Sequence, residues 1–233
     1  MIDGIELAST GQDAYASVQE TIARNLANAN TVGFKKNMVS FKTVLDGEST
    51  SLQTDYGIDY SHGNLKYTGN TFNMAIDGDG FFTVETGNGI RYTRNGQFQL
   101  SSTGEMVTDT GSKVLGQGGP IVIPKGGGEI LVDKKGVIKV NGKEIGRIKI
   151  TNFNDLAKLA PTGNSTFAAP DDVVDDTGEK KHNVAQGYLE SSNVSVVTEM
   201  VDMITNMRSY EASNNVIKTF SKLMERLIST QST

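Results

Sequence analysis

The most informative stretch of this chain is residues 196–228, which read VVTEMVDMITNMRSYEASNNVIKTFSKLMERLI. Apolar or small residues recur there at alternating steps of four and three, the spacing that a heptad repeat places on one face of a helix. The pattern predicts a long helix whose apolar face needs a partner. This C-terminal stripe consists of Val196, Met200, Met203, Met207, Tyr210, Asn214, Ile217, Ser221, Met224 and Ile228.

A second stripe lies within residues 5–30, and its members are Leu7, Gly11, Ala14, Val18, Ile22 and Leu26. Most of them are small, so a neighbouring helix can approach closely. Asn28 and Thr31 favour local hydrogen bonds from side chain to backbone over continued helix. Gly33 suits the positive φ that often ends a helix. We therefore expect a first helix over residues 3–28.

Between the two stripes the sequence has the character of β structure. From residue 74 onward, short apolar runs such as 81–84 and 137–140 are broken by Gly and Asn. Asn-Gly pairs, for example Asn141-Gly142, favour tight hairpin turns. Strands at this spacing predict a small antiparallel barrel or sandwich. The polar residues 161–183 are expected to form a solvated loop.

These patterns together predict an α+β fold. The expected parts are a discontinuous, coiled-coil-like helical domain (residues 1–34 and 195–233), an extended connecting segment (35–75) and a central antiparallel β domain (76–194). Because the two stripes are predicted to face other copies, the helical domain is expected to drive assembly.

The overall composition narrows the possible functions. The 233 residues carry a net charge of −5 and contain no cysteine, so no basic face for nucleic acid, disulfide framework or thiolate nucleophile is expected. The first residues, MIDGIELAST, lack the basic and apolar regions of a secretory signal, and no run approaches the ~18 apolar residues of a membrane span. Composition alone favours the cytoplasm, although export without a cleaved signal leaves the same composition.

No catalytic or metal site is expected. His62 and His182 are the only histidines, and neither has a second ligand at metal-binding spacing. The run Asp77–Gly80 begins like a calcium loop but lacks the closing Glu, because position 88 is Asn88. We therefore predict neither a cofactor nor a metal, and we interpret the methionines of the C-terminal stripe as packing residues.

Four sequence blocks resemble the bacterial flagellar rod and hook family. They are NLANANTVGFK at residues 25–35, GDGFFTV at 78–84, YTRNGQF at 92–98 and QGYLESSNV at 186–194. Because they span nearly the whole chain in the order of the family, the resemblance is much more specific than any single motif.

Within the family, the chain resembles the FlgF and FlgG types of rod protein. The short chain, the segment VLGQGGPIVIP at residues 114–124 and the absence of a long insertion after Phe41 favour the proximal-rod FlgF type. The blocks at 186–190 and 208–211 are at least as similar to the distal-rod FlgG type. FlgF is the prediction, and FlgG or another hook-family subunit is the alternative.

The resemblance implies a non-enzymatic axial subunit of the periplasmic rod, which transmits torque from the motor to the hook. It also implies export by the flagellar type III apparatus without a cleaved signal. The implied partners are further copies of the chain and other rod proteins, with hook, ring proteins and peptidoglycan as surroundings.

On this interpretation, residues of both stripes and of the segment after the first helix form the subunit interface. They are Leu7, Val18, Ile22, Asn25, Leu26, Asn28, Thr31, Gly33, Phe34, Val196, Met200, Met203, Ile204, Met207, Arg208, Tyr210, Glu211, Ile217, Met224 and Ile228.

Two rival interpretations belong to other functional classes. A β domain that binds the cell wall, carried on a helical oligomerisation stalk, needs exposed aromatic residues, for which Tyr60, Tyr67 and Tyr92 are candidates. A muramidase needs paired carboxylates, and no such pair stands out in the sequence.

Overall fold

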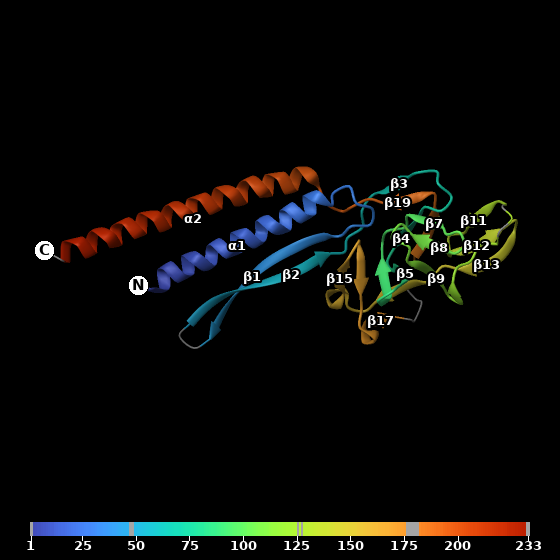
Figure 1. Cartoon of the computed structure of the whole chain (residues 1–233), viewed down its shortest axis with the longest axis horizontal. Coiled ribbons are helices and arrows are strands. Elements are labelled where there is room, and N and C mark those ends of the chain that lie inside the picture. Colours follow the sequence, from blue (N-terminus) through green and yellow to red (C-terminus); the bar gives the residue numbers. More distant parts are fainter. Residues whose placement is uncertain (1, 47–48, 125, 127, 176–181, 232–233) are drawn as a thin grey trace. The chain divides into compact units, whose positions relative to one another are not determined.

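The computed structural model describes the whole chain except residues 1, 47–48, 125, 127, 176–181 and 232–233. The chain divides into two compact units (Figure 1). The terminal unit contains residues 1–29, 36–59 and 194–233, and the β unit contains residues 30–35 and 60–193. The chain therefore passes between the units four times.

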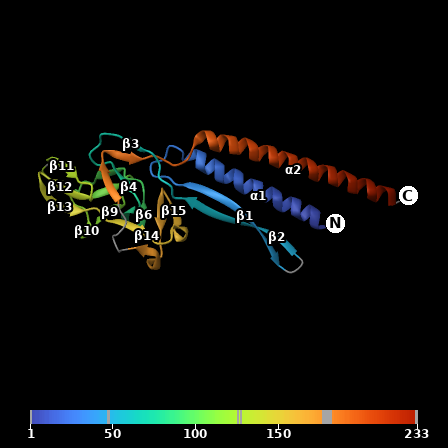
Figure 2. The same cartoon turned by 180° about the vertical axis from the view of Figure 1, so that it is seen from behind.

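Two long helices, α1 (Ile2–Ala27) and α2 (Val196–Gln231), lie side by side in the terminal unit (Figures 1 and 2). The first helix ends where the sequence predicts, because the Asn28 side chain donates to the Arg24 carbonyl. The second begins after Ser195, whose hydroxyl accepts a hydrogen bond from the Thr198 backbone N–H. Within the described residues, neither helix is long and apolar enough to cross a membrane.

A long hairpin completes the terminal unit. Strands β1 (Lys36–Asp46) and β2 (Ser49–Asp59) pair antiparallel along their full length, and α1 contacts both. Figure 2 shows the hairpin beside α1. The sequence predicts only an extended connection here, because the polar residues of β2 give no core-facing pattern.

The β unit is built from short antiparallel strands. They are β3 (Leu65–Tyr67), β4 (Met74–Gly78), β5 (Phe81–Thr86), β6 (Gly89–Thr93), β7 (Phe98–Leu100), β8 (Met106–Thr108), β9 (Lys113–Gly116), β10 (Gly119–Pro120), β11 (Ile130–Val132), β12 (Val137–Val140), β13 (Lys143–Arg147), β14 (Ile150–Phe153), β15 (Ala160–Gly163), β16 (Thr166–Ala168), β17 (Val174–Asp175), β18 (His182–Gln186) and β19 (Tyr188–Glu190), with 3₁₀ turns η1 (Leu156–Lys158) and η2 (Asp171–Val173).

A ten-stranded sheet dominates this unit, with the order β15-β16-β6-β5-β9-β8-β7 along its main path. β11, β12 and β13 form a separate three-stranded sheet, and β4 and β3 pair with β18 and β19. The principal core is aliphatic with two phenylalanines, and its fully buried members include Met74, Phe82, Val84, Met106 and Ile138. A second cluster brings Tyr60, Phe81, Tyr92, Phe153 and Phe167 together edge to face.

The predicted α+β fold class is wrong. Nineteen strands and two α-helices occur in the described residues, so the chain is mainly β, and a hairpin accompanies the helices in the terminal unit. Parts of the predicted solvated loop, 161–183, that the structure describes also form strands: β16 buries Phe167 between Thr166 and Ala168. Short polar strands with a single buried residue give too weak an alternation to be recognised.

Gly96 offers a test of the packing in the β unit. A Cβ added at Gly96 lies 1.6 Å from the Met74 carbonyl oxygen, so the backbone must move to accommodate it. We expect Gly96→Ala to lower the free energy of unfolding by about 3 kcal/mol. Thermal and urea denaturation of the purified protein measures this loss. Gly118, which has nothing within 4 Å of the added Cβ, provides the control, and Gly118→Ala should change stability by less than about 0.5 kcal/mol. Equal stability of the two variants would contradict the packing described.

Candidate functional site

The side of α2 that faces α1 is largely polar. Glu199 and Asn206 are buried there, and Met203 is half-buried. The Asn206 amide donates to the Tyr15 carbonyl and to the Gln19 side chain, both at 3.0 Å. Gln12 and Asn214 also bond to one another. Amide hydrogen bonds therefore join the two helices of one chain.

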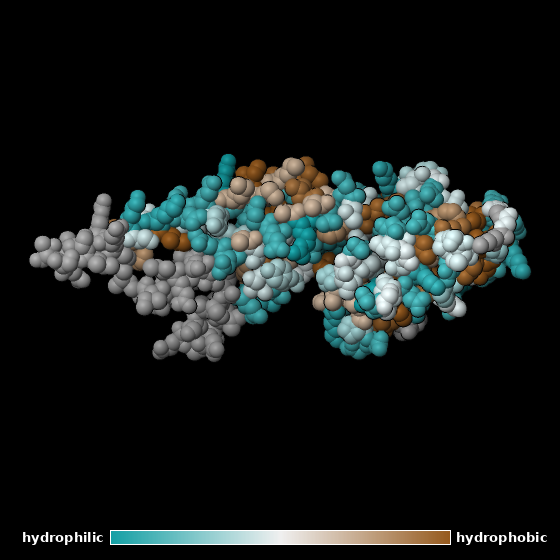
Figure 3. Space-filling view, in the orientation of Figure 1, coloured by the Kyte–Doolittle hydropathy of each residue, from teal (hydrophilic) through white to brown (hydrophobic). Residues whose placement is uncertain are grey.

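The apolar side chains of α2 gather instead on its solvent-facing side. Val197, Met200, Val201, Ile204 and Met207 form this α2 patch, and their exposed fractions lie between 49% and 73%. Their spacing of three and four residues places them on one side of the helix. Figure 3 shows the hydrophobic surface over the first turns of α2. A contiguous exposed apolar patch of this kind is typical of an interaction surface.

The patch differs in part from the predicted stripe. Met200 and Met207 belong to both, and Ile204 is a predicted interface residue outside the stripe, while Val197 and Val201 were missed. The heptad register places Val196 and Met203 on the predicted apolar face together with Met200 and Met207. Val197 and Val201 lie on the other side of Met200 and Met207, outside that face. An i, i+4 count from Val197 through Val201 would have found them.

The other predicted residues of α2 lie at several places around the helix. Arg208 and Glu211 are exposed, Tyr210 is 40% exposed, Val196 is 38% exposed and Ile217 is half-buried. For Met224 and Ile228, and for Leu7 in α1, the structure describes the backbone alone. An interface role for all these residues stays a prediction.

In α1, Ile22 and Asn25 are buried, and Val18, Leu26 and Asn28 are half-buried. Ile22 and Asn25 thus already have partners within the terminal unit.

Asn25 is the centre of a polar cluster in that unit. Its amide exchanges two hydrogen bonds with the Asn37 backbone, each 2.8 Å, and also donates to Glu199. Glu199 in turn forms an ion pair with Lys36. These contacts join α1, β1 and α2, so the described side chain of Asn25 holds its own subunit together. Any contact with a second subunit remains a prediction.

A groove of about 510 Å³ lies beside this cluster, between α1, β1 and α2. We call it the terminal groove. Its lining residues are Val18, Thr21, Ile22, Asn25, Lys36, Asn37, Met38, Val39, Glu199, Asp202, Thr205, Asn206 and Ser209. Met38 is 46% exposed at this surface.

Three predicted interface residues, Thr31, Gly33 and Phe34, belong to the β unit. Gly33 adopts φ +67°, and an added Cβ would lie 2.4 Å from the Asn95 backbone nitrogen. The Gly33 N–H donates to the Glu190 carbonyl at 2.8 Å. Thr31 and Phe34 are half-buried, and a backbone hydrogen bond joins them.

Glu190 is the most heavily bonded carboxylate in the described part of the chain. Its Oε1 accepts from Lys35 Nζ at 2.7 Å and from the Gly63 N–H at 3.0 Å, and its Oε2 accepts from Arg94 Nη1 at 3.3 Å. The side chains of Glu190, Lys35 and Arg94 are at most 3% exposed. Lys35 also donates to the Ser61 carbonyl. We call Glu190, Lys35 and Arg94 the Glu190 cluster.

The cluster is a structural site. Burial lowers the pKa of the Arg94 guanidinium, and the nearby Glu190 carboxylate opposes that shift. Arg94 further donates to the Ile76 and Gly78 carbonyls and lies over the Phe81 ring. Two cations thus share one carboxylate, and backbone carbonyls also accept from Lys35 Nζ and from both Arg94 Nη atoms, while Arg94 Nε is buried without a hydrogen-bond partner among the described residues. Sequence reasoning missed this cluster because nothing local links positions 35, 94 and 190.

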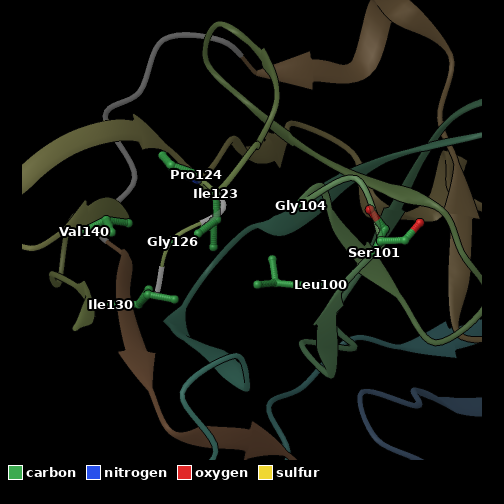
Figure 4. A pocket seen from close by; sticks show the side chains of 9 residues that line it. Leu100, Ser101, Gly104, Ile123, Pro124, Gly126, Ile130 and Val140 are labelled. Carbon is green, nitrogen blue, oxygen red and sulfur yellow. The ribbon is translucent and has the colours of Figure 1, made fainter. Parts of the chain in front are cut away.

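The described residues provide little for catalysis. Figure 4 shows a pocket of about 270 Å³ in the β unit, lined by Leu100, Ser101, Ser102, Gly104, Ile123, Pro124, Gly126, Ile130 and Val140. None of these side chains titrates. Within the described part of the chain, no three His, Cys, Asp or Glu residues gather as a metal would require.

The tyrosines proposed for a cell-wall platform do not form one. Tyr92 is buried and Tyr60 is half-buried among phenylalanines, where burial raises the pKa of Tyr60 to about 12. Only Tyr67 is well exposed, and its ring pairs with that of Tyr188.

Comparison with known families identifies the class of protein. Residues 5–35 match the family described as flagella basal body rod protein, and residues 75–140 match the D1 domain of the flagellar hook protein FlgE/F/G family. Residues 185–230 match the C-terminal region of the flagellar basal body rod FlgEFG proteins.

Individual relatives agree over nearly the whole chain. The flagellar basal-body rod protein FlgF of Mesorhizobium japonicum is 34% identical, over 99% of this chain and 98% of its own. FlgF of Caulobacter vibrioides is 35% identical over 83% of both chains. FlgG of Bacillus subtilis is 30% identical over 98% of both.

The chain therefore belongs to the family of flagellar basal-body rod proteins. It is a structural subunit of the rod in the flagellar basal body, where it assembles with other rod components, and it is not an enzyme. The predicted family and function are confirmed.

The Glu190 cluster generates a prediction. Glu190→Gln keeps the side-chain shape but leaves two buried cations without a counter-charge, so the β unit should lose about 3–5 kcal/mol of stability. Denaturation followed by near-ultraviolet circular dichroism measures the change. Glu105→Gln serves as the control, because the Glu105–Lys113 pair is on the surface of the same unit and should contribute little. Unchanged stability of Glu190→Gln would show that the cluster is not needed.

Proposed function

We propose that the chain is an axial subunit that polymerises through its terminal helices, with copies of itself and with other rod proteins, into the drive shaft that carries torque from motor to hook. The observation that supports this proposal most directly is the α2 patch. Its five apolar side chains are exposed in the single chain. Complete burial of such a side chain contributes about 1.5–3 kcal/mol relative to exposure, so burying these half-exposed groups provides a driving force for assembly.

The interface is proposed to centre on the predicted interface residues that lie in the patch, namely Met200, Ile204 and Met207. Arg208 and Glu211 follow on the same side of α2 and are exposed. They are proposed to make polar contacts at the end of the patch. Leu7, Met224 and Ile228 extend both stripes toward the chain ends and are proposed to contact neighbours there.

We propose the proximal-rod FlgF type. The FlgF relatives are 34–35% identical to this chain, against 30–32% for the FlgG relatives. The alignment with FlgF of Mesorhizobium japonicum spans 242 positions, whereas that with FlgG of Bacillus subtilis spans 264 and thus needs longer gaps. Both observations support FlgF, with FlgG as the alternative.

Export through the flagellar type III apparatus and a periplasmic position are part of the same proposal. Both are inferred from the membership of the chain in the family of flagellar basal-body rod proteins. Neighbours are then proposed to include other rod proteins, the hook, the surrounding rings and peptidoglycan. Electron microscopy of basal bodies from a deletion strain tests the position, since loss of the rod with an intact membrane ring is expected for a proximal subunit.

Met207→Asp tests the proposed interface. Met207 is exposed in the single chain, so the variant should fold, but a charge buried between subunits without a partner costs several kcal/mol. We expect the variant to be produced and folded, absent from the rod and non-motile. Swimming assays and basal-body purification measure both effects.

Val216→Asp is the matched control, because Val216 is 68% exposed on the same helix but lies outside the patch. It should leave motility near the wild-type level. A normal rod in the Met207→Asp strain would refute the proposed interface.

A further inference from the structure

The α2 patch and the terminal groove lie on opposite sides of the same helix. Successive residues of an α-helix are rotated by about 100°, so Glu199 and Asn206 lie roughly opposite Ile204. Glu199 and Asn206 line the groove, and Ile204 lies in the middle of the patch. One subunit therefore presents an apolar ridge on one side and a hollow on the other.

We propose that the α2 patch of one copy docks into the terminal groove of the next copy of this chain. The inference rests on the proposed function, since it names the surface that receives the patch in the polymer. The occupant of the groove is thus a second copy, and the contact is directional.

The groove suits an apolar ridge. Val18 and Val39 are half-buried in its lining, and Met38 is 46% exposed there, so apolar area is available on both α1 and β1. The polar groups of Asn25 and Asn206 already form hydrogen bonds within the subunit. A docked apolar helix would therefore leave these amides with their partners.

Charge supports the same pairing. Arg208 follows Ile204 by one helical turn on the side of the patch, and Asp202 lines the groove. Neither takes part in a salt bridge among the described residues. Docking of the patch brings Arg208 of one copy toward the groove of the next copy, where the Asp202 carboxylate has no ion-pair partner among the described residues. Complementary charges of this kind fix the orientation of an interface.

The arrangement has a consequence for assembly. A surface that docks onto a different surface of the next copy is heterologous, and a heterologous contact that does not close produces an open helix. A patch that docked onto the same patch of a second copy would give a closed dimer instead. The proposed pairing is thus the kind that a rod requires.

Disulfide cross-linking in flagellated cells tests the pairing, because the natural chain contains no cysteine. Met38→Cys and Ile204→Cys are introduced singly and together, and basal bodies are treated with a mild oxidant. The double variant should give a ladder of covalent dimers, trimers and longer products, and each single variant should remain monomeric. Dimers from Ile204→Cys alone would indicate patch-to-patch contact and overturn the proposal, as would a double variant that assembles without any cross-link.

Charge exchange provides a second test. Asp202→Arg and Arg208→Asp should each reduce swimming at least tenfold, and the double variant should recover most of it. Asp109→Arg, in an exposed turn of the β unit, controls for the change in net charge and should swim normally. Loss of motility without recovery in the double variant would overturn the Asp202–Arg208 pairing.

The two proposals fail in different ways. If Met207→Asp is excluded from the rod but the paired cysteines and charges show no coupling, the chain is an axial subunit whose patch docks elsewhere. If Met207→Asp assembles normally, the patch itself is not an interface, and the proposed mode of assembly fails with it.

Discussion

The buried Glu190 carboxylate is the contact on which the organisation of the chain depends. The carboxylate accepts hydrogen bonds from Lys35, Arg94 and the Gly63 N–H. The backbone carbonyl of Glu190 accepts a further hydrogen bond from the Gly33 N–H. All four passages of the chain between the units occur within a few residues of these groups. Since buried ion pairs contribute little net stability over apolar packing, we interpret the cluster as fixing where these segments leave the β unit.

The terminal unit follows a different principle. Its helices and hairpin are joined by side-chain amides and by the Lys36–Glu199 ion pair, while the five apolar side chains of the α2 patch remain exposed. In such a unit the buried polar groups form hydrogen bonds or ion pairs with one another, and the exposed apolar area is available to a partner. This is the reverse of the usual distribution in a monomeric domain, and it agrees with membership in a family of rod subunits.

Local regularity determined how much could be predicted from sequence. The two helices follow from their 3.6-residue periodicity, and the strands near Phe81 and Val137 follow from short apolar runs with turn residues. The β2 strand is mostly polar and the 160–168 hairpin has Phe167 as its one large apolar residue, so they were predicted as connections and the fold class was wrong. The heptad register missed Val197 and Val201, and contacts between distant positions such as Lys35 and Glu190 leave no local pattern.

The amide contacts between α1 and α2 have one more consequence. Apolar helices can slide past one another at little cost, but Asn206 meets the Tyr15 carbonyl and Gln19 at only one axial alignment. A single polar residue in a helix contact can specify register in this way. Every copy therefore holds α1 and α2 in the same axial register, so each subunit presents an identical arrangement of helical surfaces to its neighbours.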